Sequence, residues 1–357
     1  MASLPLRPLW LHQTRLSGKA VRLNQNVTIV RNLEGLPFPA QASLPQRNII
    51  VEQIREALGD FKTEWIECPL SIASSQERAL LKSLANLEQP CDETVIWYHS
   101  KNFTQIIAND GDHVRFYGTF PGGTLKNAWG SLDALEEKIG EQLDYAFDPT
   151  NGYSASEPQL CGMGLRVQLL LHLPALCFDR QLPKLIEAAS EMDLRLEPLR
   201  VSDHKALGHL FLLSNAVNLG IDEKSLLTHL ETIAEKIISE ELRIRKVMLT
   251  EHAAFSRDSI GRSLGLLGNC CELTFEEAMH LLSVVVMAVD NGILSVRKRA
   301  LLLRLWRSLS LEHLREFCQK AISSSDEDRA RAAIVKETMS QVFKKSSDAK
   351  RKISRAV

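Results

Sequence analysis

One stretch of the chain, residues 145–176, constrains the fold more than any other, because it combines a chain reversal with a buried strand. The reversal is indicated by Asn151 and Gly152, residue types that tolerate the backbone dihedral angles of a tight turn. The strand is indicated by the apolar run 167–173, which Pro174 closes. The pattern therefore predicts a turn that leads directly into a core strand.

Between the turn and the strand lie residue types that suit a phosphate ligand. Gly162 and Gly164 flank a segment where the backbone can approach a ligand closely. Arg166 follows, and its planar guanidinium offers a fixed fork of hydrogen-bond donors to phosphate. The residues alone leave two interpretations open, a tight structural connection or a phosphate-binding loop.

Composition excludes several classes of protein. A chain of 357 residues is too long for one simple core and predicts two or three domains. A net charge of −1 argues against binding of nucleic acid through bulk charge. The seven cysteines show no CxxC pair, so no metal site is expected, and their odd number suits reduced thiols. No apolar run reaches the roughly 20 residues of a membrane span, and the first residues lack a signal-peptide pattern. These observations predict a cytoplasmic protein without membrane contact.

Apolar periodicity predicts an α+β fold. Residues 1–92 are expected to be mainly helical and loop-rich, whereas alternating and β-branched residues from position 94 to 120 predict an antiparallel strand pair. A helix is expected at 125–143, strands are expected within 194–215, and the chain is expected to be helical from 246 onward. Asp222 is an expected helix cap, and Thr274 with Glu277 is an expected capping box.

The stretch 145–176 resembles the active-site segment of the phosphagen (ATP:guanido) kinases, most closely that of the bacterial protein arginine kinases. The positions that match are Gly152, Tyr153, Pro158, Gly162, Gly164, Leu165, Arg166 and the run 172–176. Glu157 stands where the family has its reactive cysteine. Gln159 and Leu160 replace the threonine and asparagine of the family pattern.

Two further segments resemble family motifs and are also altered. In the segment 21–39, Asn26 and Thr28 occupy the positions of two arginines that bind nucleotide phosphates in the family. In the segment 109–115, Gly111 occupies the position of a catalytic glutamate. This second segment keeps other family residues, namely Asn109, Asp112, His113 and Arg115. The resemblance thus implies that Arg115, Arg166, His113, Gly162 and Gly164 are remnants of a nucleotide site.

A fourth resemblance covers residues 195–215 and allows two assignments of the phosphate-binding arginine. In one register Glu197 replaces a phosphate-binding arginine, and Lys205 replaces a second catalytic glutamate. The alternative is that Arg195 or Arg200 completes the phosphate clamp instead.

A motif outside these segments, at residues 257–263, resembles the RDxxxRS motif by which protein arginine kinases bind phosphoarginine at a regulatory pocket. Its specified positions are Arg257, Asp258, Arg262 and Ser263. A carboxylate can pair with the guanidinium of phosphoarginine, and arginines and a hydroxyl can hold its phosphate. The alternative is that Asp258 and Arg262 form an ordinary surface ion pair four residues apart on a helix.

The resemblance implies a phosphagen-kinase-like catalytic domain, with a mainly helical N-terminal part (1–92) and an antiparallel-sheet core (93–245). A helical domain for phosphoarginine binding and dimerisation, with a basic tail, would follow (246–357). Because the catalytic positions are altered, the favoured hypothesis is a pseudokinase that binds phosphoarginine and serves as an adaptor, with no cofactor expected. The first alternative is an active protein arginine kinase that uses ATP-Mg, and the second is a ligand-free structural oligomer. The implied partners are a phosphoarginine-bearing protein, a zinc-finger activator protein, a Clp-type unfoldase and a second copy of the chain.

Overall fold

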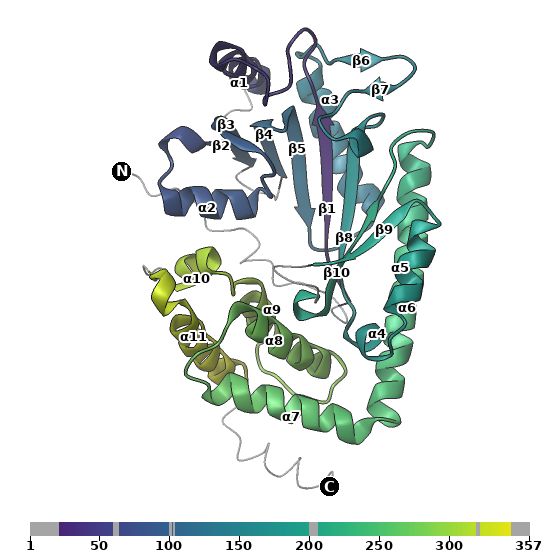
Figure 1. Cartoon of the computed structure of the whole chain (residues 1–357), viewed down its shortest axis with the longest axis vertical. Coiled ribbons are helices and arrows are strands. Elements are labelled where there is room, and N and C mark those ends of the chain that lie inside the picture. The colour runs from purple at the N-terminus through teal and green to yellow at the C-terminus, as the bar shows by residue number, and fades with distance from the viewer. Residues whose placement is uncertain are drawn as a thin grey trace.

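An eight-stranded antiparallel sheet forms the centre of the molecule, in the order β2-β3-β4-β5-β1-β8-β10-β9 (Figure 1). The computed structural model describes residues 21–59, 64–99, 102, 104–199, 206–318 and 322–343. The strands of the large sheet are β1 (Arg22–Arg31), β2 (Trp65–Pro69), β3 (Pro90–His99), β4 (Thr104–Asp110), β5 (Asp112–Phe120), β8 (Leu165–His172), β9 (Leu194–Pro198) and β10 (Leu210–Asn215). A short hairpin of β6 (Phe147–Asp148) and β7 (Gly152–Tyr153) forms a second sheet.

Helices cover both faces of the large sheet. One face is covered by α1 (Leu44–Leu58), α3 (Leu125–Gly140) and α6 (Glu223–Thr250), whose apolar residues share one core with those of the sheet. The opposite face of β2 to β5 is covered by α2 (Ser75–Leu84). Two shorter helices, α4 (Pro174–Phe178) and α5 (Leu182–Ser190), follow β8. The α+β class predicted from the sequence is therefore confirmed.

The position of β1 differs from the prediction, which placed residues 22–31 in a mainly helical region. The strand lies in the middle of the sheet and pairs with β5 on one side and β8 on the other. The physical reason is the run 27–30, Val-Thr-Ile-Val, in which every residue is β-branched and therefore favours extended backbone. The first strand of the sheet is consequently contributed by the N-terminal part of the chain.

Most other expected elements are present. Where an antiparallel pair was predicted within 94–120, the structure has three strands, β3, β4 and β5. The helix predicted at 125–143 is α3, and the run 167–173 lies largely in β8. Asp222 caps α6 by accepting a hydrogen bond from the Ser225 backbone N–H. Thr274 caps α8 (Phe275–Asp290) in the same way by accepting from Glu277 N–H.

The C-terminal helices pack against one end of the sheet (Figure 1). They are α7 (Ala253–Asn269), α8 (Phe275–Asp290), α9 (Arg299–Arg307), α10 (Leu311–Cys318) and α11 (Glu327–Val342). Leu23 and Leu210 of the sheet lie in one apolar cluster with Leu282 and Trp306 of these helices. Because α6 continues through residue 246, the predicted boundary at 245–246 falls inside one helix, and the division into domains stays a prediction. No helix among the described residues is long and apolar enough to cross a membrane.

Candidate functional site

The sheet brings the altered motif positions next to a retained arginine. Thr28 on β1 pairs with Arg166 on β8, and Asn26 pairs with Gln168 two residues along. Directly paired residues of antiparallel strands project from the same face of a sheet. Asn26, Thr28 and Arg166 therefore share one face, as the family resemblance requires, although only Arg166 carries the charge expected there.

Two carboxylates hold the Arg166 guanidinium. Its Nη1 atom lies 2.8 Å from Glu88 Oε1, and its Nη2 atom lies 2.5 Å from Glu157 Oε2. Glu157 is the residue that replaces the family cysteine, whereas Glu88 comes from the loop between α2 and β3. The donors that suited Arg166 to phosphate are thus occupied by the chain's own acids.

Arg115, the second retained arginine, is buried and similarly engaged. Its Nη2 atom lies 2.6 Å from Asp110 Oδ2 and also donates to the Ala85 carbonyl, while Nη1 donates to the Asn86 carbonyl. Its Nη1 atom lies 3.8 Å from the Glu88 carboxylate. Arg115 consequently fastens the loop that follows α2 onto β5, and this loop places Glu88 beside Arg166.

Glu88 and Glu157 form an acid pair, and their pKa values are shifted in opposite directions. Burial, followed by a hydrogen bond with Glu157, raises the pKa of Glu88 to about 7. Burial acts to raise the pKa of Glu157 as well, but the hydrogen bond from Glu88 and the Arg166 charge outweigh it and lower that pKa. Below about pH 7, Glu157 is therefore the ionised member, and Glu88 holds the proton that the two acids share.

Sequence reasoning missed Glu88. Glu88 lies outside the segments that resemble family motifs, and the residues around it show no apolar periodicity that would predict a helix or a strand. Its place is fixed by Asp110, whose carboxylate accepts hydrogen bonds from the backbone N–H groups of Glu88 and Gln89. Only the tertiary structure brings this loop to β8.

Gly111 occupies the tip of the β4–β5 turn, where φ is +79°. A Cβ atom added at this position would lie 3.2 Å from Ser156 Oγ. The loop carrying Ser156 is in turn held by Asp112, which accepts from the Ser156 backbone N–H at 2.7 Å and from its hydroxyl at 2.9 Å. The position therefore offers no carboxylate, and the neighbouring loop leaves little room for one.

His113 is buried, and both nitrogens of its ring form hydrogen bonds to the backbone. Its Nδ1 atom accepts a hydrogen bond from Leu33 N–H, and its Nε2–H donates to the Pro37 carbonyl at 2.8 Å. Burial lowers the pKa of His113, so the ring is neutral at pH 7. With both nitrogens engaged by the backbone, His113 fastens the segment 33–37 to β5, and the predicted contact with a nucleotide stays a prediction.

The structure accounts for Gly162 and Gly164 by internal packing. Both have positive φ angles, +108° and +65°. An added Cβ would lie 2.4 Å from the Asn218 carbonyl oxygen at Gly162, and 2.6 Å from the Val30 carbonyl oxygen at Gly164. The close approach expected at these glycines is therefore made by neighbouring backbone of the same chain, and their predicted role in nucleotide binding stays untested.

The last predicted positions of the clamp lie at the sheet edge. Glu197 on β9 pairs with Leu212, and Arg195 pairs with Ser214, which pairs in turn with Gln168. Arg195 and Glu197 thus project from the same face as Asn26, but from a strand two positions away from β8. Arg200 and Lys205 lie outside the described residues.

The phosphoarginine motif lies on α7. Asp258 and Arg262 are 62% and 76% exposed and form an ion pair of 2.7 Å, and Arg257 is also exposed. Ser263 is on the buried side of the helix, where its hydroxyl donates to the Ser259 carbonyl, and its predicted contact with phosphoarginine stays a prediction. Three of the four motif residues therefore lie together on an accessible surface.

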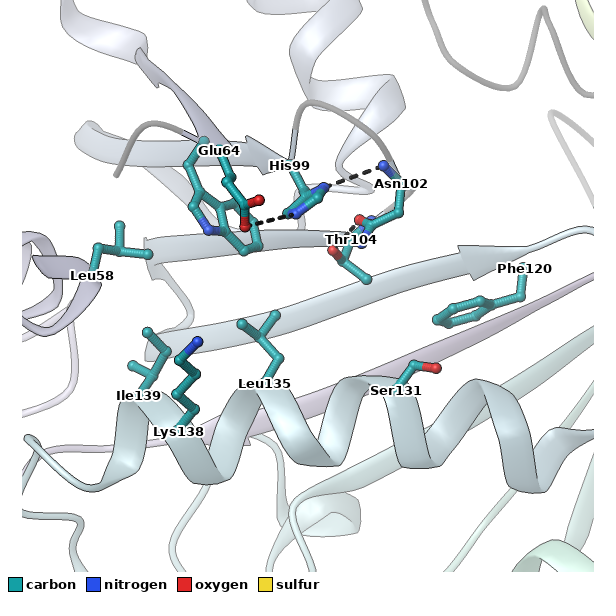
Figure 2. Close-up of a pocket in the computed structure, with 11 residues that line it drawn as sticks. Leu58, Glu64, His99, Asn102, Thr104, Phe120, Ser131, Leu135, Lys138 and Ile139 are labelled. Atoms are coloured by element: carbon teal, nitrogen blue, oxygen red, sulfur yellow. Dashed lines mark hydrogen bonds and ion pairs between the residues drawn. The ribbon is translucent and has the colours of Figure 1, made fainter. Parts of the chain in front are cut away.

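A separate cavity of about 240 Å³ lies between α3 and the strands β2 to β5 of the large sheet (Figure 2). Figure 2 shows Lys138, Leu135 and Ile139 of α3 on one side and His99 with Glu64 on the other. The polar groups bond to one another: His99 lies 3.7 Å from Glu64 and accepts from Asn102 N–H at 3.2 Å. None of the predicted site residues lines this cavity, which is therefore distinct from the candidate site around Arg166.

The arrangement around Arg166 does not fit a nucleoside triphosphate. A triphosphate carries several negative charges and needs convergent N–H donors. Arg166 instead faces two carboxyl groups, and Asn26 and Thr28 supply no charge. Among the described residues, no three His, Cys, Asp or Glu side chains are grouped as around a metal ion.

The fold and the matched motifs define a phosphagen-kinase-type protein. A family model described as ATP:guanido phosphotransferase, C-terminal catalytic domain, matches residues 52–244, more than half of the chain, and the chain belongs to this family. A second model, the protein-arginine kinase McsB C-terminal domain, matches residues 255–350.

The relatives narrow the family to protein-arginine kinase homologues. A protein-arginine kinase of Clostridium acetobutylicum is 28% identical over 92% of this chain and 99% of its own length. Another, from Caldanaerobacter subterraneus subsp. tengcongensis, is 30% identical over 78% of this chain and 85% of its own. Among solved structures, a lombricine kinase aligns with a TM-score of 0.56 at 20% identity, over 66% of this chain and 71% of that one, which shows the shared fold.

Proposed function

We propose that this protein is a pseudokinase of the protein-arginine kinase type, which binds phosphoarginine and serves as an adaptor. The observation that carries the proposal is the pairing of Arg166 with both Glu88 and Glu157. The family resemblance implies that Arg166 belongs to a phosphate clamp, and acids bound to it would compete with the phosphates of ATP. The protein keeps the kinase fold, but Glu88 and Glu157 of the same chain occupy the side of Arg166 at which a phosphate would bind.

Loss of catalytic groups supports the same conclusion. Removal of one donor that stabilises transition-state charge costs about 10²–10³ in rate. Removal of a general base costs roughly 10²–10⁴. Asn26 and Thr28 replace two such donors, and Gly111 replaces the carboxylate. Even with strong non-additivity between these losses, little phosphoryl transfer is expected.

The phosphoarginine part of the proposal rests on the surface of α7. Asp258 can pair with a guanidinium, and Arg262 can pair with a phosphate. Opening their mutual ion pair costs only a few tenths of a kcal/mol, because both groups are well exposed. An exposed pair of opposite charges is thus compatible with a ligand that carries both charges.

The adaptor role follows from the family resemblance. The partners it suggests are a zinc-finger activator protein, a Clp-type unfoldase and a second copy of the chain, in the cytoplasm. An active kinase is the second candidate, and one observation favours it: Arg195 projects from the sheet face that carries Arg166. In that case Arg195 would complete the clamp, and Glu157 would replace the family thiolate.

Calorimetry separates these possibilities when ATP-Mg and phosphoarginine are titrated separately into the full chain. The pseudokinase predicts heat with phosphoarginine and none with ATP-Mg, and no arginine phosphorylation of a generic protein substrate. Phosphorylation above background that Arg166→Ala abolishes would instead establish the active kinase. A folded chain that binds neither ligand would support the ligand-free oligomer.

A further inference from the structure

The cavity between α3 and the strands β2 to β5 has largely apolar walls (Figure 2). The apolar and aromatic side chains that line it are Leu58, Trp65, Phe120, Leu135 and Ile139. The Trp65 ring is buried and meets the His99 ring edge-on, with ring centroids 5.0 Å apart. Walls of this kind favour a ligand with a hydrocarbon part.

Two groups of opposite charge line the same cavity from opposite sides. Lys138 belongs to α3, and Figure 2 shows its ammonium group pointing from the helix toward the strands. Glu64 lies on the other side, immediately before β2, and 47% of its side chain is exposed, so a ligand can reach its carboxylate. The contact of this carboxylate with His99 Nε2, at 3.7 Å, is longer than a hydrogen bond. The cavity thus combines apolar walls with one cation and one anion.

We propose that this cavity binds a free α-amino acid with an apolar side chain of about the size of leucine. The α-carboxylate pairs with Lys138, the α-ammonium group pairs with Glu64, and the side chain packs against the apolar walls. The inference goes beyond the proposed function, because the cavity is separate from the candidate site around Arg166 and from α7.

The volume of the cavity sets the size of the ligand. An engineered protein cavity of about 150 Å³ holds a molecule of benzene. By proportion, the 240 Å³ of this cavity accommodate a molecule of about ten non-hydrogen atoms. A free amino acid such as leucine has this size, whereas a nucleotide is far larger.

The two charges favour a zwitterion over other ligands of this size. A purely apolar molecule would cover Lys138 and Glu64 without pairing them, at a cost in desolvation. A phosphate or another polyanion would meet the carboxylate of Glu64. A free amino acid carries one carboxylate and one ammonium group on the same carbon, next to its side chain, and so matches the charges and the apolar walls together.

Ligand-observed NMR titrations of the full chain test the proposal with L-leucine and two analogues. The first analogue, 4-methylpentanoate, lacks the ammonium group, and the second, 3-methylbutylamine, lacks the carboxylate. We expect the wild type to bind leucine about tenfold more tightly than either analogue, the effect of one charge-assisted contact. Equal affinities for the three molecules would overturn the inference, because the cavity would then accept any apolar molecule.

Two variants assign each charge of the ligand to its partner. Lys138→Met should weaken leucine binding by about tenfold without weakening that of 3-methylbutylamine. Glu64→Gln should weaken leucine binding by about tenfold without weakening that of 4-methylpentanoate. Lys126→Met is the matched control, because Lys126 is exposed on α3 but does not line this cavity, and it should bind leucine like the wild type. Leucine binding that neither Lys138→Met nor Glu64→Gln weakens would reject the assigned contacts.

A third variant fills the cavity. Ser131 lines the cavity from an exposed position on α3, so Ser131→Trp should abolish leucine binding while circular dichroism shows an unchanged fold. Leucine binding that persists in this variant would place the ligand elsewhere, and absence of leucine binding to the wild type would reject the site altogether. Both results would overturn the inference and leave the proposed function standing, since calorimetry with ATP-Mg and phosphoarginine tests that function separately.

Discussion

Glu88, in the loop after α2, lies 2.8 Å from the guanidinium of Arg166 on β8, although 78 residues separate the two in sequence. Arg166 is the phosphate ligand implied by the family motif, and Glu88 is outside every motif. The contact therefore links a retained family residue to an acid that only the tertiary structure brings near it. Its consequences for nucleotide binding and for stability can be measured separately.

Removal of both acids should release Arg166. In the double variant Glu88→Gln and Glu157→Gln, the negative charge beside the guanidinium is lost while side-chain volume is kept. We expect ATP affinity to rise by about tenfold or more, the effect of one recovered charge-assisted contact, with arginine phosphorylation still at background. Calorimetry with ATP-Mg measures the ATP affinity, and a phosphorylation assay measures the arginine phosphorylation. Glu137→Gln, at an exposed position on α3, is the matched control, and an unchanged ATP affinity in the double variant would refute this account of the clamp.

Stability should fall as pH rises through the titration range of Glu88. The folded-state pKa of Glu88 is about 7, above its ordinary value of 4.5. The folded chain therefore binds the proton more tightly than the unfolded chain, and this contribution is present below about pH 4.5 and lost by about pH 7. Glu157 titrates below this window, because its pKa is lowered.

Urea unfolding at pH 5 and pH 7.5 measures this effect. The free energy of unfolding of the wild type should fall between these pH values, relative to Glu88→Gln, by on the order of 1 kcal/mol. This figure is reduced from the full pKa difference because the Glu88 side chain is 34% exposed. A difference between the two proteins that does not change with pH would contradict the shared-proton arrangement.

The β4–β5 turn should resist restoration of the family carboxylate. Gly111→Glu places a Cβ-bearing residue at φ +79° and 3.2 Å from Ser156 Oγ, so we expect a loss of about 1–3 kcal/mol in unfolding free energy. Gly111→Asn, a residue type that tolerates positive φ, should lose less. Combined with Glu157→Cys, Gly111→Glu should still give no kinase activity, since Asn26 and Thr28 leave the clamp incomplete. Activity in that double variant would show that the missing arginines are not required.

The family motifs predicted candidate site residues, and the structure shows where in the fold those residues lie. Thr28 and Arg166 were expected together, and they are paired residues of neighbouring strands. Glu88 could not be expected, because loop placement depends on contacts such as Asp110 with the Glu88 backbone. Helical periodicity places Ser263 on the buried side of α7, which the motif alone does not reveal, and its expected contact with a ligand stays a prediction.

Ser283 of α8 should contribute strongly to the attachment of the C-terminal helices. Its hydroxyl lies 2.7 Å from His172 Nε2 on β8 and 2.7 Å from His209 Nδ1. Arg245, which can only donate, lies 3.5 Å from His172 Nδ1, so His172 carries its proton on Nε2 and donates it to Ser283. The Ser283 hydroxyl then donates to His209, whose pKa is lowered to about 3 by burial and by the neighbouring His280.

Ser283→Ala leaves the buried His172 and the half-buried His209 without this partner, so we expect a loss of about 1–3 kcal/mol in unfolding free energy. Ser308→Ala is the control: Ser308 is also buried, but its hydroxyl donates only to the Arg304 carbonyl within its own helix, and about 1 kcal/mol or less is expected. Because the folded-state pKa of His209 is depressed, its contribution to stability is present above pH 6.5 and lost as pH falls toward 3. Equal losses in the two variants would show that the histidine contacts add nothing.

Phosphoarginine affinity should depend on Asp258 and Arg262 and not on Ser263. Asp258→Ala removes the carboxylate that pairs with the ligand guanidinium, and Arg262→Lys replaces a planar fork with a point charge, so each should weaken binding by roughly tenfold. Both side chains are well exposed, and circular dichroism should show an unchanged fold. Ser263→Ala is the matched control, because its hydroxyl donates to the Ser259 carbonyl on the buried side of α7. Free arginine should bind far more weakly than phosphoarginine, since the phosphate contacts are missing. If arginine and phosphoarginine bind equally, or if both variants match the wild type, Asp258 and Arg262 form only a surface ion pair.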